Sequence, residues 1–115
     1  MPPRELRLTP TFFHLLLCLA DGPKHGYAMM LEIEERTDGT VRPGPSSLYY
    51  SLARLEDAGL IAETGQSGTP HEVHEERRRY YALTAAGRRR LQDELAILGQ
   101  VVKHARARGI AVQTR

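Results

Sequence analysis

The sequence predicts a mainly α-helical chain with a small β-hairpin. Helical periodicity and helix-boundary residues mark four stretches, at about residues 10–20, 25–37, 45–58 and 84–108. Two candidate strands, residues 60–64 and 78–83, lie between the third and fourth helices and are joined by a polar connection of 13 residues; residues 40–42 are a further candidate strand. Three helices, a hairpin with a long polar tip and a last helix give the order of elements in a winged helix-turn-helix domain with a C-terminal dimerisation helix.

The third predicted helix has the clearest boundaries. Pro45 suits its first turn, because the fixed φ of proline fits there and its missing N–H is not needed. Gly59 suits the left-handed position just after the helix. Leu48, Leu52 and Leu55 recur at i, i+4 and i+7, so we expect them to form one buried stripe.

The other face of this helix carries small hydroxyls, phenols and a guanidinium. Five residues turn away from the leucine stripe or lie at its flank: Ser46, Ser47, Tyr49, Tyr50 and Arg54. Such groups contact phosphates and base edges, so this face is a candidate recognition surface for duplex DNA. The alternative is an ordinary surface helix with a few polar residues.

The first two helices follow from similar patterns. Thr9 and Pro10 predict the N-cap and the first residue of the first helix. That helix is apolar on nearly all sides, so it is expected to be buried, or half buried against a partner chain. In the second helix we expect the packing stripe at Tyr27, Met30 and Leu31.

Length and composition bound the remaining possibilities. A chain of 115 residues allows one domain with a modest core, divided here into a DNA-binding unit (1–83) and a dimerisation helix with its tail (84–115). The net charge of +2 is weak evidence for a nucleic-acid partner, but arginines cluster at 77–79 and 88–90. The longest apolar run is far shorter than the roughly 20 residues of a membrane span. With one cysteine, Cys18, in an apolar helix, we expect a buried thiol in a reducing cytoplasm and no membrane partner.

Three motifs stand in order along the chain: Gly22-Pro-Lys-His-Gly-Tyr27, Ser47-Leu-Tyr49 followed by Arg54-Leu-Glu56, and Arg79-Tyr-Tyr-Ala-Leu-Thr-Ala-Ala-Gly87. With these motifs the sequence resembles the PadR family of winged helix-turn-helix transcriptional regulators, from about residue 15 to residue 91. The resemblance implies a sequence-specific DNA-binding regulator of the short subtype, which has one C-terminal helix. It also implies a repressor that a small-molecule effector releases from DNA, with an effector site that the sequence does not locate.

Nine residues are candidates for DNA contact: Lys24, His25, Ser46, Ser47, Tyr49, Tyr50, Arg54, Arg77 and Arg79. A helix-turn-helix places the N-terminal part of its recognition helix in the major groove, braced by the preceding helix. The resemblance implies that Tyr49 contacts the DNA backbone, whereas Tyr50 stands where many family members have proline. Lys24 can neutralise a phosphate.

Several of these candidates have a structural alternative. Ser46 can serve as a plain helix cap, and His25 can cap a backbone group. The Arg54 guanidinium can pair with Glu56 or Asp57 on its own helix. In the hairpin tip, three carboxylates weaken the attraction of the arginines for DNA: Glu72, Glu75 and Glu76.

The last helix is the candidate dimerisation element. Thr84 predicts its N-cap, and Gly87 is tolerated in its first turn. An apolar stripe follows at i, i+4, i+7 and i+11: Leu91, Leu95, Leu98 and Val102. About 25 residues span about 37 Å, which exceeds a winged domain of this size, so we expect a partner chain in addition to packing on its own domain. The first helix would complete a homodimer interface with Phe12, Phe13 and Leu16, and a two-fold dimer would match a pseudo-palindromic operator.

No motif indicates an enzyme, a cofactor or a metal site. The sequence contains no nucleophile elbow, phosphate loop, HExxH motif or paired cysteines. His71 and His74 lie three residues apart in a predicted loop, but two histidines without further ligands are not a metal site. The alternative to a DNA-binding regulator is a winged-helix module that binds other proteins, which the near-neutral charge and the acidic hairpin tip would suit.

Overall fold

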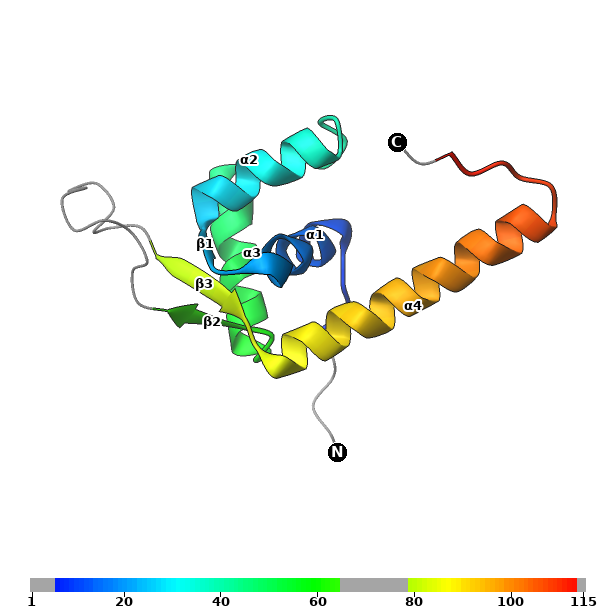
Figure 1. Cartoon of the computed structure of the whole chain (residues 1–115). Coiled ribbons are helices and arrows are strands. Elements are labelled where there is room, and N and C mark those ends of the chain that lie inside the picture. Colours follow the sequence, from blue (N-terminus) through cyan, green and yellow to red (C-terminus); the bar gives the residue numbers. More distant parts are fainter. Residues whose placement is uncertain (1–5, 65–78, 114–115) are drawn as a thin grey trace.

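The computed structural model describes residues 6–64 and 79–113. The elements in chain order are α1 (Pro10–Cys18), the 3-10 turn η1 (Leu19–Asp21), β1 (Lys24–His25), α2 (Gly26–Arg36), α3 (Pro45–Asp57), β2 (Ile61–Thr64), β3 (Tyr80–Leu83) and α4 (Ala85–Ala107). The strands form an antiparallel sheet of order β1-β3-β2. Helices α1, α2 and α3 gather beside this sheet, and α4 leaves it as a long rod (Figure 1). The predicted winged helix-turn-helix with a long last helix is confirmed.

The helix boundaries are set by local hydrogen bonds. Thr9 and Thr84 cap α1 and α4 as predicted, because their hydroxyls accept hydrogen bonds from the N–H groups of Phe12 (3.2 Å) and Gly87 (2.9 Å). The N-cap of α3 is Gly44, without a side-chain bond, so the alternative that Ser46 is the cap is wrong. Gly59 has a positive φ of 76° after α3, as expected.

The sheet contains a strand that was not predicted and lacks one that was. Residues 40–42 form no strand, because the Thr37 hydroxyl accepts a hydrogen bond from the Val41 N–H (3.0 Å) and holds this segment as a turn. Asp38 and Gly39 have positive φ within the same turn. The third strand is β1, where Lys24 pairs with Tyr81 and His25 pairs with Tyr80 of β3.

The core lies between α1, α2, α3 and the sheet. Its largest fully buried side chains come from every one of these elements: Leu15, Leu16, Leu19, Met29, Ile33, Leu48, Leu52, Leu55 and Ile61. The leucine stripe predicted for α3 is therefore confirmed.

The packing stripe predicted for α2 is wrong at Tyr27 and Leu31, whereas Met30 is partly buried and packs against the core. Tyr27 and Leu31 are about half exposed (49% and 48%), and the buried residues are Gly26, Met29 and Ile33. The reason is the close approach of α2 to α3 at Gly26. A Cβ there would lie 3.2 Å from the Tyr49 ring, so the face that contains Gly26 is the one that turns inward.

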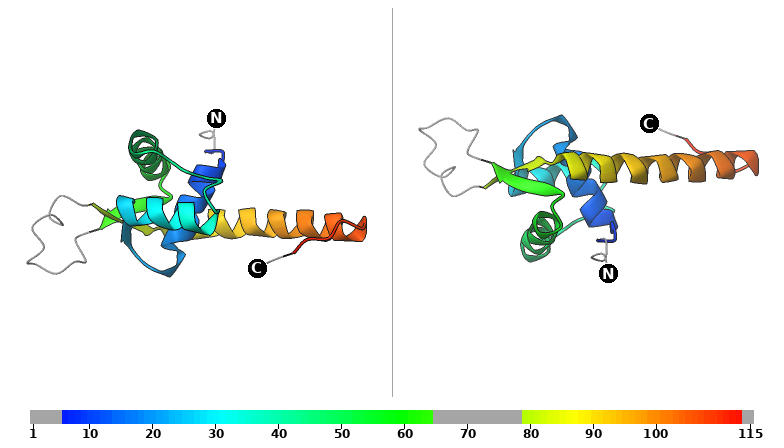
Figure 2. Two further views of the ribbon diagram at one scale, coloured as in Figure 1. Left: turned by 90° about the horizontal axis from the view of Figure 1, so that it is seen from above. Right: turned by 90° about the horizontal axis from the view of Figure 1, so that it is seen from below.

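Only the first turns of α4 belong to the packed domain. Leu91 is buried, and a Cβ on Gly87 would lie 1.9 Å from the Leu60 carbonyl oxygen, so α4 requires glycine there rather than merely tolerating it. The Arg88 and Arg90 guanidinium groups donate hydrogen bonds to the carbonyls of Ala20 (3.2 Å) and Leu6 (2.6 Å). The rest of α4 projects away from the domain in all three views (Figures 1 and 2).

Candidate nucleic-acid interface

The outward face of α3 is open to solvent, as the sequence predicts. Ser46, Ser47 and Arg54 are exposed, and the phenols of Tyr49 and Tyr50 are 54% and 63% exposed. The opposite face is buried, including the hydroxyl residue Ser51. The N-terminal half of α3 contains no acidic residue, so its face offers neutral donors and acceptors near a positive helix end.

Helix α2 braces α3 at the same end. Gly26 opens α2 and lies against the side chains of Leu48, Tyr49 and Leu52, which is the close contact of a helix-turn-helix pair. His25 precedes it as the N-cap: its Nδ1 accepts a hydrogen bond from the Ala28 N–H at 3.1 Å. The capping alternative for His25 is thus confirmed, and its DNA contact stays a prediction.

Lys24 is held inside a polar cluster next to β1. Its ammonium donates to the Cys18 carbonyl (2.6 Å), to Asp21 (2.9 Å) and to Glu32 (2.8 Å). Burial by itself would lower the pKa of Lys24. The hydrogen bonds to Glu32 and Asp21 outweigh the effect of burial, so the pKa is raised. Because these three contacts occupy its donors, we leave Lys24 out of the proposed interface.

The same cluster surrounds the Cys18 thiol and sets its pKa. Cys18 is fully buried, as predicted. Arg36 donates to Glu32 (2.7 Å) and lies 3.6 Å from the Cys18 sulfur. Burial is the main cause that raises the pKa of Cys18 to about 11, so the thiol stays protonated and unreactive near neutral pH. Burial and, second, the charge of Arg36 lower the pKa of His14 beside it.

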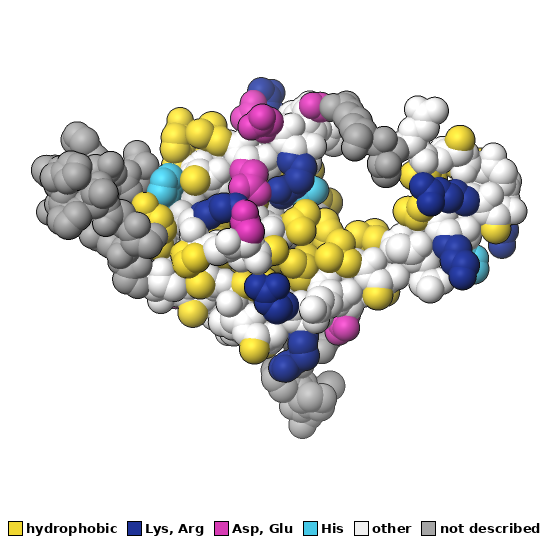
Figure 3. Space-filling model, in the orientation of Figure 1, with side chains coloured by type: hydrophobic (Ala, Val, Ile, Leu, Met, Phe, Trp, Pro, Cys, Tyr) yellow, Lys and Arg dark blue, Asp and Glu magenta, His cyan; other side chains and the backbone are white. Residues whose placement is uncertain are grey.

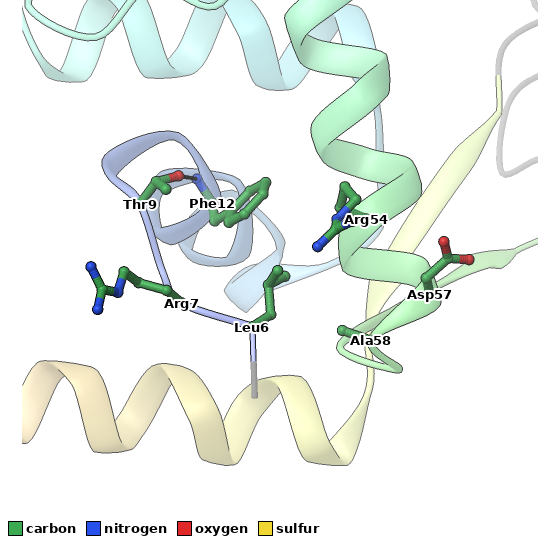
Figure 4. Close-up of a pocket in the computed structure, with 7 residues that line it drawn as sticks. All are labelled: Leu6, Arg7, Thr9, Phe12, Arg54, Asp57 and Ala58. Atoms are coloured by element: carbon green, nitrogen blue, oxygen red, sulfur yellow. Dashed lines mark hydrogen bonds between the residues drawn. The ribbon is translucent and has the colours of Figure 1, made fainter. Parts of the chain in front are cut away.

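Arg54 does not form the ion pairs considered for it. Glu56 and Asp57 are close in sequence, yet the described part of the chain provides no salt bridge or hydrogen bond to its guanidinium. Figure 4 shows this side chain directed from α3 toward Leu6 and Phe12. It lines an open groove of about 790 Å³ between α3 and the segment before α1. The lining residues are Leu6, Arg7, Thr9, Phe12, Arg54, Asp57 and Ala58.

The hairpin formed by β2 and β3 contributes one described candidate. Arg79 is exposed, and its Nε lies 3.9 Å from Glu63 on the neighbouring strand. Arg77, the three glutamates of the hairpin tip and the two histidines weighed as metal ligands lie outside the described residues. Within residues 6–64 and 79–113, no three His, Cys, Asp or Glu side chains gather as a metal site. Among the helices of these residues, none has the length and hydropathy of a membrane span.

The residues expected at a dimer interface divide into two groups. Phe12, Leu16 and Leu91 are buried in the domain's own core (8%, 0% and 4% exposed), so they offer no surface to a second chain. For these three, the alternative of packing on their own domain is correct. Leu95 and Leu98 are 42% and 41% exposed, and Phe13 and Val102 are partly buried.

Two further apolar residues are exposed on α4, and the sequence pattern did not identify them as interface candidates. Ile97 and Val101 are 58% and 57% exposed. They extend the apolar face of α4 beyond the i, i+4, i+7 row, and their one-turn spacing was the signal that could have identified them. Figure 3 shows hydrophobic side chains over α1 on the side that faces α4.

Solved structures share this architecture. A PadR family regulator from Clostridium difficile superposes with a TM-score of 0.68 over 86% of this chain and 97% of that chain, at 19% identity. RosR of H. salinarum gives a TM-score of 0.64 over 79% of this chain and 74% of that chain, at 26% identity. PadR of Bacillus subtilis, crystallised in complex with operator DNA, gives a TM-score of 0.59 at 27% identity, over 73% of this chain and 45% of that chain.

Sequence comparisons point the same way. An uncharacterized 37.1 kDa protein in transposon TN4556 of Streptomyces fradiae is 44% identical over 81 residues, which are 70% of this chain. The chain spans only 21% of that relative's length. The model of the family described as transcriptional regulator PadR-like matches residues 15–93, more than half of the chain. This protein therefore belongs to the PadR-like family of transcriptional regulators.

Proposed function

We propose that this protein binds a specific duplex DNA sequence through the outward face of α3. The observation that carries the proposal is the exposed row of Ser46, Ser47, Tyr49, Tyr50 and Arg54 on a helix whose other face is buried. Serine and tyrosine hydroxyls contact phosphates, and a guanidinium contacts phosphates or guanine edges. The operator complex of the B. subtilis relative supports this use of the fold. Arg79, and Arg77 two residues before it, would hold the DNA backbone next to the hairpin.

The protein acts as a homodimer in this proposal. The apolar face of distal α4, with Leu95, Leu98, Val101 and Ile97, is open in a single chain, and a second copy would cover it. Residues 1–83 then bind DNA, while residues 84–115 join the two copies, although the first turns of α4 also complete each DNA-binding core. A two-fold dimer presents two recognition helices about 34–36 Å apart, which matches a pseudo-palindromic operator.

The regulatory outcome in this proposal is repression that a small-molecule effector relieves. The family resemblance supports this step, since a dimer seated on an operator that overlaps a promoter excludes the transcription machinery. The effector and its site are left open.

A fluorescence-anisotropy titration with the intergenic DNA next to this gene tests DNA binding. We expect tight binding to this DNA, weaker binding to an unrelated duplex of equal length, and a steep loss of affinity between about 50 and 200 mM salt.

Arg54→Ala should weaken operator binding by about 1–3 kcal/mol while the dimer persists.

The matched control is Lys103→Ala, which removes one exposed positive charge from distal α4, far from α3. Its affinity for the operator should equal that of the natural chain. Equal, weak affinity for both duplexes would contradict the proposal and favour the alternative of a winged-helix module that binds other proteins.

A further inference from the structure

The groove beside α3 joins two arginines that come from distant parts of the sequence. Arg54 belongs to α3, and Arg7 lies in the extended segment before α1. Leu6 and Phe12 supply the apolar part of the groove between them (Figure 4). Arg7 is not among the nine residues that the sequence indicates for DNA contact.

Both guanidinium groups are exposed and have no hydrogen-bond or ion-pair partner among the described residues. This distinguishes them from Lys24, Arg36 and Arg42, each of which pairs with a glutamate at 3.0 Å or less. The groove does contain one carboxylate, that of Asp57, but Figure 4 shows it directed away from both arginines. Two positive groups at this groove are therefore available to external anions.

The groove lies on the same side of the molecule as the recognition helix. In both views of Figure 2, α3 and the segment that enters α1 project to one side of the domain, while α4 runs along the other direction. The N-terminal segment also lies on the side of α3 toward which α4 extends. A duplex seated on α3 would therefore pass over this segment as well.

We propose that Arg7 binds a DNA backbone phosphate beside the recognition helix, so that the segment before α1 is a second anchor for the duplex. This inference rests on the proposed DNA-binding function. The direction of the side chains favours a duplex over a small anion: Arg54 points into the groove, whereas Arg7 points away from Arg54 (Figure 4), so the two do not converge on one carboxylate. Two separate phosphates of a duplex suit two guanidinium groups that point in different directions.

The salt dependence of binding tests this assignment. Each phosphate neutralised contributes about −0.9 to the slope of log affinity against log salt concentration. Arg7→Gln should make the slope of the dimer less steep by about 1.8, for one contact per copy, and should weaken binding to operator and to unrelated duplex by similar factors. Arg7→Lys, which keeps the charge, should retain most of the slope.

Two controls separate this effect from a change in folding or in overall charge. Lys103→Gln removes the same charge at a distant position and should leave the slope as in the natural chain. The thermal unfolding midpoint of Arg7→Gln should also be unchanged, because no described contact depends on this guanidinium.

The possible failures are distinguishable. If the natural chain binds operator and Arg7→Gln has the same slope and affinity, the anchor is overturned while the proposed function stands. If Arg7→Gln leaves DNA binding unchanged but abolishes binding of benzoate measured by calorimetry, the groove is a small-anion site and the anchor is likewise overturned. If the natural chain binds no duplex, the proposed function is contradicted, and the Arg7 anchor that rests on it is overturned with it.

Discussion

The two halves of α4 carry the same apolar repeat in different surroundings. In the half nearest the domain, Leu91 is 4% exposed, and Gly87 lies against the Leu60 carbonyl. Farther along the helix, Leu95 and Leu98 continue the repeat yet are 42% and 41% exposed. The comparison teaches that a helical repeat identifies which face of a helix is apolar, whereas it does not identify what covers that face.

The exposed half has the character of an interface rather than of an ordinary surface. Single exposed apolar residues are normal, but here Leu95, Ile97, Leu98 and Val101 lie within two turns of one helix. The arc they span is wider than the strict a/d seam of a two-stranded coiled coil, so one partner helix would leave part of it open. A second chain that contributes more than one element would cover it.

Leu95→Asp is expected to produce the largest effect, because it places a charge in each half of the proposed dimer interface. A buried unpaired charge costs about 3–5 kcal/mol, so the dissociation constant of the dimer should rise at least about 100-fold. Light scattering on a size-exclusion column measures the change. Gln100→Asp adds the same charge at an exposed position on the far side of α4 and should leave the dimer intact. A stable dimer of Leu95→Asp would contradict the proposed interface.

Leu91→Ala and Leu98→Ala compare the two halves within a single chain. Made in the Leu95→Asp background, where the interface is absent, Leu91→Ala should lower the free energy of unfolding by about 2–5 kcal/mol, because it leaves a cavity in the core. Leu98→Ala should change it by less than about 1 kcal/mol. Urea denaturation gives both values. Equal losses would mean that the domain itself covers distal α4.

Two glycines of α4 provide the smallest and sharpest test. Gly87→Ala should destabilise the same monomeric background by about 1–3 kcal/mol, since its Cβ would overlap the Leu60 carbonyl. Gly99→Ala should stabilise it by about 0.5–1 kcal/mol, since apart from the nearby backbone of its own helix no atom lies within 4 Å of the added Cβ, and alanine favours a helix. Thermal unfolding measures the change in unfolding midpoint for both variants. Changes of the same sign would show that the contact between Gly87 and the Leu60 carbonyl does not exclude a Cβ.

Several features were predictable because they depend on neighbours within a few residues. The capping hydroxyls of Thr9 and Thr84, and the positive φ of Gly59, follow from local chain geometry. The buried and exposed faces of α3 were also correct, because its leucines and its polar residues separate cleanly around the helix. The same reasoning failed for α2, whose apolar residues are spread around the helix so that periodicity admits more than one inward face.

Other features needed distant parts of the chain. Lys24 is an apparent phosphate ligand in sequence, but Cys18 and Glu32 converge on it only after α1 and α2 pack together. Strand β1 has two residues and exists because β3 lies beside it. The groove between Arg7 and Arg54 joins positions 47 residues apart (54 minus 7) and has no sequence signature.

The sequence alone determines the ends of the helices, the exposed hydroxyl-rich face of α3 and the membership of a regulator family. These properties follow from backbone preferences and short-range spacing, which any fold must respect. Tertiary structure alone decided which face of α2 turns inward, where the apolar row of α4 stops being covered, and which cations lack an ion-pair partner in the described part of the chain. Burial and ion pairing depend on segments that meet only when the chain has folded, so local patterns cannot specify them.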